Sequence, residues 1–210
     1  MITRRKFLMS TAYVLATAPS LFIPRIGYSN EERTGLESKF PEEFFYEYGT
    51  TKEEILDIVK MSKETRTLGG SRNFSPKKVL VLPNNEEPYV FEGIASFYTS
   101  NRFPGKTATG APFHDYLPTV ALNPRTKTAI PALVRLTNLV DGEIGTSTLA
   151  VANDKGPYVE DKRGRLIPHD KRVVDLSMET LNRLGLEKEK GLYKIRLEVL
   201  ETYDINSKNS

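Results

Sequence analysis

The clearest pattern of hydrophobic and polar positions lies in the second half of the chain, where short apolar segments alternate with turn residues. Segments of this length that are rich in valine, isoleucine, threonine and tyrosine predict β-strands. The turn from Asn138 to Gly142, with Asp-Gly at its end, separates two of them. The expected strands are Ile94 to Tyr98, Thr119 to Leu122, Ala132 to Thr137, Thr146 to Ala152 and Tyr193 to Leu200.

A short helix is expected between the last two of these strands. Ser177 is a favourable N-cap, and Leu181 and Leu184 give the helix an apolar inner face. Gly185 suits the position that follows the helix end. Short strands with one short helix near the end are typical of a small closed barrel, so the expected fold class is mainly β.

Residues 30–90 are predicted to form an N-terminal α/extended region that precedes the barrel. Thr51 and Glu54 can form a capping box at the start of a helix that continues to about Ser62. One apolar face of this helix carries Ile55, Ile58, Val59 and Met61. A loop at 69–71 and a buried strand at 78–82 are expected to follow.

The first 29 residues have the pattern of an export signal. Arg4, Arg5 and Lys6 precede a mostly apolar run to Ile23, which is typical of a secretory signal and not of a membrane span. The paired arginines resemble a twin-arginine signal, and cleavage would leave a mature start near Asn30. The alternative is a retained N-terminal anchor helix. No cysteine follows the apolar run, so the segment has no lipobox.

Composition and charge narrow the function classes. Hydrophobic residues make up 39% and charged residues 27% of the chain, as in an ordinary globular protein. Zero cysteines exclude disulfides and thiolate chemistry, and two separated histidines give no convincing metal site. Four of the 30 basic residues lie in the first 29 positions, so the remainder carries 26 basic and 27 acidic groups. Near-neutral charge does not indicate a nucleic-acid partner.

Six motifs between Gly93 and Leu200 resemble, in the same order, those of the rare lipoprotein A (RlpA) family. The most specific are Asn153-Asp154-Lys155-Gly156-Pro157, which is Asn-Asp-Arg-Gly-Pro in the family, and Arg172 to Ser177, which ends in Asp-Leu-Ser in both. The others are Gly93 to Tyr98, Lys106 to Gly110, Val134 to Leu139, and the pair Leu184 to Leu186 with Val199-Leu200. The match covers about half of the chain.

The resemblance implies a six-stranded double-psi β-barrel at 91–203, followed by a tail at 204–210. It also implies lytic transglycosylase activity on peptidoglycan in the periplasm, with a preference for glycan strands that lack stem peptides. Such enzymes cleave after N-acetylmuramic acid, leave a 1,6-anhydro ring and need no cofactor. A cell-envelope or divisome protein is a further partner to consider.

Asp154 is the candidate catalytic residue. A lytic transglycosylase uses the sugar's own C6 hydroxyl as nucleophile, so one carboxyl group can protonate the leaving oxygen and then deprotonate the hydroxyl. Acid catalysis requires a raised pKa. The alternative is that Asp154 only caps its own turn. The groove is expected to be lined by Tyr98, Arg135, Asn138, Asn153 and Lys155.

Two positions depart from the family pattern. Ala111 stands where active members carry a glutamate, and Leu122 where they carry a histidine. His114 or Asp115 are candidates to replace the missing proton-transfer group, while Asp175 is expected to form structural hydrogen bonds or to pair with an arginine. The alternatives to an enzyme are a non-catalytic, expansin-like glycan-binding module and a structural envelope protein that docks onto a partner.

Overall fold

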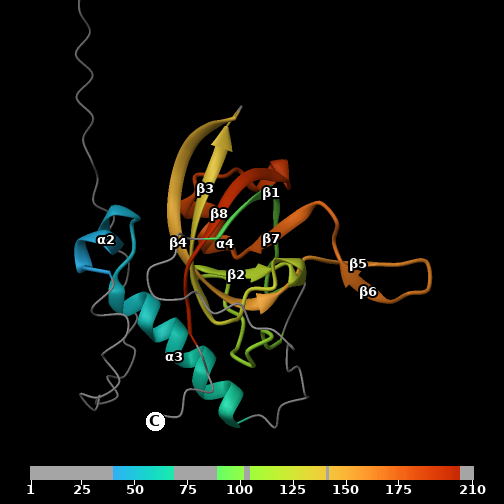
Figure 1. Ribbon diagram of the computed structural model, residues 1–210, viewed down its shortest axis with the longest axis horizontal. Coiled ribbons are helices and arrows are strands. Elements are labelled where there is room, and N and C mark those ends of the chain that lie inside the picture. The colour runs from blue at the N-terminus through green and yellow to red at the C-terminus, as the bar shows by residue number, and fades with distance from the viewer. Residues whose placement is uncertain (1–39, 69–88, 102–104, 141, 204–210) are drawn as a thin grey trace, which may run out of the picture. The chain divides into compact units, whose positions relative to one another are not determined.

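The computed structural model describes residues 40–68, 89–101, 105–140 and 142–203, which all lie in one compact unit. Six strands close into a barrel, and a separate two-stranded sheet extends away from it (Figure 1). The barrel strands are β1 (Tyr89–Phe97), β2 (Thr119–Leu122), β3 (Ala132–Val140), β4 (Glu143–Lys155), β7 (Arg172–Leu176) and β8 (Tyr193–Thr202). The remaining elements are α2 (Glu42–Glu47), α3 (Lys52–Leu68), η1 (Pro124–Thr126), β5 (Tyr158–Glu160), β6 (Leu166–Pro168), α4 (Met178–Arg183) and η2 (Lys188–Lys190).

The barrel has the strand order β1-β7-β2-β4-β3-β8, and β8 pairs with β1 to close it. Two pairs, β1 with β7 and β2 with β4, are parallel, whereas the other four are antiparallel. Closure gives every barrel strand two neighbours, so the barrel has no free edge. The predicted fold class, a mainly β protein with a small six-stranded double-psi barrel, is confirmed.

The barrel interior is filled by aliphatic side chains that alternate along the strands. They come from all six strands and from α4: Ala95, Val120, Leu122, Val134, Leu136, Ala150, Ala152, Val174, Leu176, Leu181, Leu184, Ile195 and Leu197, each fully buried. The alternation follows from the pleat, which turns successive side chains to opposite faces of the sheet. Neighbours of these residues therefore point outward, and that outer face carries the polar groups described below.

The predicted strands lie where they were expected, but four of the five extend further and two features were missed. β2 has the predicted bounds, whereas β4 begins three residues earlier than Thr146. Its first four residues are exposed, and Ile144 is the one large apolar side chain among them, so the sequence gives little sign of this extension. The sixth barrel strand, β7, has only five residues and lies between charged segments. The hairpin of β5 and β6, whose strands have three residues each, was not predicted either.

The helix after Ser177 is confirmed in detail. The Ser177 side chain accepts a hydrogen bond from the Thr180 backbone N–H at 3.2 Å, as an N-cap does. Leu181 and Leu184 are fully buried against the barrel core. Gly185 has φ +65°, the left-handed conformation that favours glycine after a helix end.

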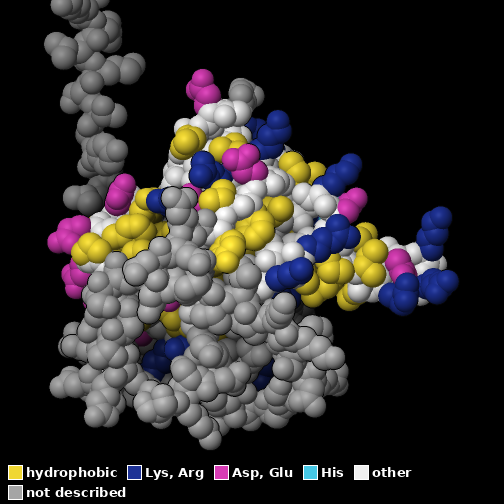
Figure 2. Space-filling view, viewed as in Figure 1, with side chains coloured by type: hydrophobic (Ala, Val, Ile, Leu, Met, Phe, Trp, Pro, Cys, Tyr) yellow, Lys and Arg dark blue, Asp and Glu magenta, His cyan; other side chains and the backbone are white. Residues whose placement is uncertain are grey.

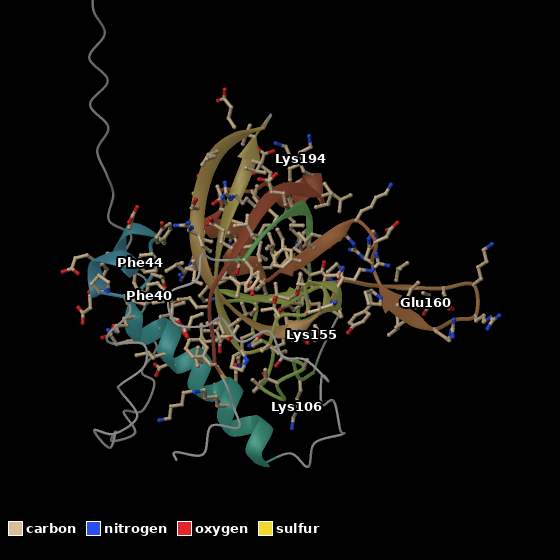
Figure 3. The ribbon with its side chains drawn as sticks, in the orientation of Figure 1. Phe40, Phe44, Lys106, Lys155, Glu160 and Lys194 are labelled. Atoms are coloured by element: carbon tan, nitrogen blue, oxygen red, sulfur yellow. The ribbon has the colours of Figure 1, made fainter. Side chains whose placement is uncertain are left out.

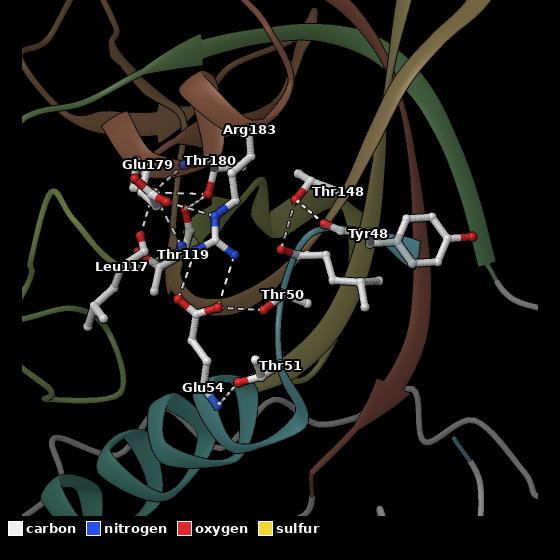
Figure 4. Close-up of polar contacts among 12 residues, drawn as sticks. Tyr48, Thr50, Thr51, Glu54, Leu117, Thr119, Thr148, Glu179, Thr180 and Arg183 are labelled. Carbon is white, nitrogen blue, oxygen red and sulfur yellow. Dashed lines mark hydrogen bonds and ion pairs between the residues drawn. The ribbon is translucent and has the colours of Figure 1, made fainter. Parts of the chain in front are cut away.

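α3 packs against β4 with the apolar face that the sequence predicted, and it extends beyond Ser62 to Leu68. Ile55, Ile58 and Val59 are buried, and the Thr51 side chain accepts from the Glu54 N–H at 3.1 Å. The Glu54 carboxylate does not complete the capping box. It pairs instead with Arg183 of α4 at 2.8 Å and accepts from the Thr50 hydroxyl at 2.5 Å (Figure 4).

Several predictions concern residues outside those described: the export signal at 1–29, the loop at 69–71, the strand at 78–82 and the tail at 204–210. The proposed division between an extension at 30–90 and a barrel at 91–203 stays a prediction. Within the described ranges, no helix combines the length and apolar character needed to cross a bilayer.

Candidate functional site

Four residues form a row across the outer face of the barrel. Ser96 of β1 is opposite Asp175 of β7, Asp175 is opposite Ala121 of β2, and Ala121 is opposite Asp154 of β4. Paired residues on neighbouring strands point to the same face of a sheet, and strands lie about 4.8 Å apart. The two aspartates therefore flank the small Ala121 side chain, with their Cα atoms about 10 Å apart.

Asp154 lies near the end of β4 and is half-buried. Burial is the main influence on its carboxyl group and raises its pKa, and the negative charge of Asp175 raises the pKa further. Hydrogen bonds from the backbone N–H groups of Lys155, at 2.8 Å, and Ala108, at 2.7 Å, act in the opposite direction, as does the Lys155 charge. The net effect is a raised pKa, which general-acid catalysis requires.

Asp175 has a different set of partners. Its Oδ1 accepts a hydrogen bond from the Ser96 hydroxyl and lies 3.7 Å from Nη1 of Arg172. Burial raises the pKa of Asp175, while the Ser96 hydrogen bond and the Arg172 charge lower it. The expected pairing of Asp175 with an arginine is thus present. An arginine beside a carboxylate favours its ionised form.

Gly156 lies against Asp175 and Ala121. A Cβ atom added there would lie 3.5 Å from Asp175 Oδ2 and 3.5 Å from the Ala121 Cβ. It would also lie 3.9 Å from the ring of Tyr158, the first residue of the β5–β6 hairpin. Burial raises the pKa of the Tyr158 hydroxyl most, and the charge of Asp154 raises it further. The influence of Asp154 also places this phenol near the row.

Three of the predicted groove residues lie close to Asp154 in the chain or in space. Tyr98 is buried and its ring stacks on Phe113 at 4.3 Å between centroids. Asn153 is buried at the bulge in β4, and Lys155 donates from Nζ to the Thr128 carbonyl at 2.6 Å. Figure 3 labels Lys155 at the end of β4. Tyr98 is covered by Phe113, so its ring packs inside the protein.

The structure does not bring Arg135 and Asn138 to Asp154. Arg135 is opposite Leu149 on β4, five residues or about 16 Å along the strand from Asp154. Its guanidinium pairs with Glu198 and donates to the Tyr48 hydroxyl at 2.9 Å. Asn138 lies still further toward the β3–β4 turn. Their assignment to a groove around Asp154 is therefore not supported by their positions in the barrel.

The two candidate substitutes for the missing family residues have other contacts. The Asp115 carboxylate accepts from the backbone N–H of Ser100 at 3.0 Å and from its hydroxyl at 2.5 Å, which closes a loop. The His114 ring stacks on Tyr116 at 5.0 Å. Asp175 is a carboxyl group whose charge raises the pKa of Asp154.

Sequence reasoning assigned Asp175 only a structural role and did not place it in the site. A signal was available, because Asp175 alternates with Val174 and Leu176 and so occupies an outward position of a strand. Among the residues described, no cluster of three or more histidine, aspartate or glutamate side chains could hold a metal ion.

Comparison with known proteins finds one curated relative over part of the chain. It is "Endolytic peptidoglycan transglycosylase RlpA" of Helicobacter pylori (strain ATCC 700392 / 26695), 29% identical over 110 residues, which are 52% of this chain and 30% of the relative. No family model matches the sequence.

Two solved structures are similar at 17% identity and a TM-score of 0.37. Streptomyces papain inhibitor (SPI) covers 56% of this chain and is itself covered completely. A mutant Clavibacter michiganensis expansin in complex with cellohexaose covers 55% of this chain, and 52% of its own length is matched. The resemblance that the sequence motifs indicated is therefore confirmed: over about half of its length, this barrel protein is similar to RlpA.

Proposed function

We propose that this protein is a peptidoglycan lytic transglycosylase of the cell envelope in which Asp154 is the general acid and base. The observation that carries the proposal is the placement of Asp154 and Asp175 on either side of Ala121 on the outer face of the barrel. The similarity to an RlpA transglycosylase supports peptidoglycan as substrate and the envelope as location. The preference for strands without stem peptides and export through a twin-arginine signal are part of the same proposal.

The proposed reaction needs one proton donor and one stabiliser of positive charge. Protonated Asp154 gives its proton to the glycosidic oxygen as the bond from this oxygen to C1 of N-acetylmuramic acid breaks. The C6 hydroxyl oxygen of the same sugar bonds to C1, and its proton passes to the Asp154 carboxylate. The products are a 1,6-anhydro ring and a free hydroxyl, and the enzyme returns to its starting state.

Asp175 is suited to the second role. Arg172 and Ser96 favour its ionised form, and a carboxylate beside C1 would stabilise the oxocarbenium-like transition state. Lys155 is less able to hold Asp154 ionised, because its ammonium group donates to the Thr128 carbonyl. Burial raises the pKa of both carboxyl groups, but only Asp175 of the two also has an arginine beside it, and we therefore assign the charged role to Asp175.

The experiment is digestion of purified, peptide-stripped glycan strands by the full chain, with products identified by mass spectrometry. We expect anhydromuramyl fragments from the wild type, at least a 100-fold lower rate from Asp154→Asn, and a lower rate from Asp175→Asn. Asp161→Asn is the matched control, because Asp161 lies in the turn of the β5–β6 hairpin, away from the row. Asp115→Asn tests whether that residue takes over the family glutamate's role.

The second candidate function is a glycan-binding module without turnover. It is favoured by the two backbone N–H groups that donate to the same Asp154 oxygen, as in a carboxylate that caps its own turn. Glycan retained in a pull-down by the wild type and by Asp154→Asn, with no fragments from either, would establish this function and exclude the enzyme.

A further inference from the structure

A hollow of about 360 Å³ lies on the outer face of the barrel beside the row of carboxyl groups. Ile94, His169, Lys171, Arg172 and Leu192 line it. The volume is near the lower end of the range for small-molecule sites, about 300–1,000 Å³. Arg172 connects the two places, because its Nη1 donates to Ser96 Oγ at 2.6 Å and the same residue lines the hollow.

One side of the hollow is apolar. Ile94 is half-buried in β1, and Leu192 is 58% exposed immediately before β8. A leucine this exposed beside a half-buried isoleucine presents an apolar surface to solvent that a bound apolar group would cover.

The other side of the hollow is cationic and can donate hydrogen bonds. Lys171 is exposed, and no carboxylate of the described residues forms an ion pair with it. His169 Nδ1 accepts from the backbone N–H groups of Lys171 and Arg172, both at 3.1 Å. The proton of the neutral ring therefore lies on Nε2, which leaves this nitrogen as a donor.

Acidic groups near the hollow reduce this positive character without cancelling it. Asp170 Oδ1 lies 3.3 Å from His169 Nδ1 but is 68% exposed. Asp175 partly neutralises Arg172. His169 Nδ1 accepts two backbone hydrogen bonds, so it carries no proton in this arrangement. The short distance from His169 to Asp170 is therefore not an ion pair. Lys171 remains as the uncompensated cation of the lining.

We propose that this hollow binds a carboxylate on a carbon that also carries a methyl group. The carboxylate would lie against Lys171 and His169, and the methyl group against Ile94 and Leu192. Peptidoglycan contains this unit in two places, the lactyl group of N-acetylmuramic acid without a stem peptide and the end of a stem peptide that finishes in alanine. The choice of these two peptidoglycan sources rests on the proposed function. The inference that the hollow binds a carboxylate beside a methyl group rests only on its lining residues.

The test is a titration of the full chain followed by NMR, using the methyl signals of Ile94 and Leu192. The probes are N-acetylmuramic acid, N-acetyl-D-alanine, the methyl esters of both, and N-acetylglucosamine, which lacks the lactyl group. We expect saturable shifts with one or both acids and none with the esters or with N-acetylglucosamine. A response to one acid alone identifies the source, and a response to both shows that the site recognises the shared group.

Three variants control the titration. Lys171→Gln should raise the Kd about two- to fivefold, the effect expected from one exposed ion pair. Leu192→Ser should also weaken binding, and it should leave the fold intact because Leu192 is 58% exposed. Lys162→Gln removes an exposed charge from the hairpin turn and should leave the Kd unchanged. Equal binding of acids and esters, or no shift with either acid, would overturn the proposal.

The outcome is separable from that of the proposed function. Anhydromuramyl products together with an unresponsive hollow would reject the carboxylate site alone. Saturable binding without products would reject the transglycosylase alone.

Discussion

At the scale of the residue, Asp154 combines catalytic suitability with a cost in stability. Its carboxyl group is half-buried, which raises its pKa above the value in the unfolded chain. Between the two pKa values the folded state binds more protons than the unfolded state, so the free energy of unfolding falls as the pH rises through this window. Above the folded-state pKa, the half-buried Asp154 carboxylate lowers the free energy of unfolding by its full amount.

Asp154→Asn should therefore become more stable relative to the wild type as the pH rises. The amide carries no charge to desolvate and can still accept hydrogen bonds from the Ala108 and Lys155 backbone. Urea unfolding of both proteins from about pH 4, near the unfolded pKa, to pH 7 measures the difference. A constant difference across this range would mean that burial does not control the titration of Asp154.

Leu122 gives a second residue-scale prediction, since restoring the family's histidine should damage the fold. Leu122 is fully buried in the barrel core, where an imidazole would lose its hydration without gaining a partner. We expect Leu122→His to lower the free energy of unfolding by about 2–4 kcal/mol. Leu122→Met, which conserves volume, should cost less than about 1.5 kcal/mol. Urea midpoints compare the two, and a gain of activity in Leu122→His would contradict the prediction.

At the scale of the element, α4 depends on its N-cap residue, Ser177. Ser177 is buried, accepts from Thr180 N–H at 3.2 Å and donates to the Leu117 carbonyl at 2.7 Å. Ser177→Ala removes these two bonds and those that Ser177 Oγ makes with the Thr119 N–H and the Thr180 hydroxyl, and it should cost about 1–2 kcal/mol of stability. Ser177→Asp can keep the cap and is the comparison in the same thermal melts. Equal melting temperatures for wild type and Ser177→Ala would show that the cap does not matter.

The elements that the sequence predicted are those with a local signal. β2 is a continuous apolar run, and α4 has both a cap and a terminal glycine, so their bounds followed from local rules. β7 was missed because five residues with one outward aspartate and an initial arginine give little periodicity. The row of Ser96, Asp175, Ala121 and Asp154 could not be predicted, because it depends on which strands become neighbours in the barrel.

At the scale of the molecule, α3 supports the barrel from outside. It contacts β4 with buried Ile55, Ile58 and Val59, and Glu54 pairs with Arg183 of α4. A fragment of residues 85–203 should therefore unfold at lower urea concentration than the full chain, because this apolar face of α3 no longer covers β4.

Ile58→Ala in the full chain is the matched control for the fragment. Its side chain is 1% exposed, so truncation should cost about 2–5 kcal/mol. Equal urea midpoints for the fragment and the full chain would show that the barrel folds without support from α3.

Closure of the barrel also determines how its amides exchange with solvent. Every barrel strand has a neighbour on both sides, so the backbone N–H groups in its doubly paired part become accessible when the barrel opens. The β5–β6 hairpin is a separate two-stranded sheet with three-residue strands, and Figure 2 shows its side chains exposed on the projecting arm. Deuterium should therefore enter the hairpin early and the barrel late. The two segments are close in the chain, because Pro157 at the base of the hairpin lies only three residues from Asp154. The side chains that would flank a glycan thus stand at the boundary between the slowest and the fastest exchanging segments.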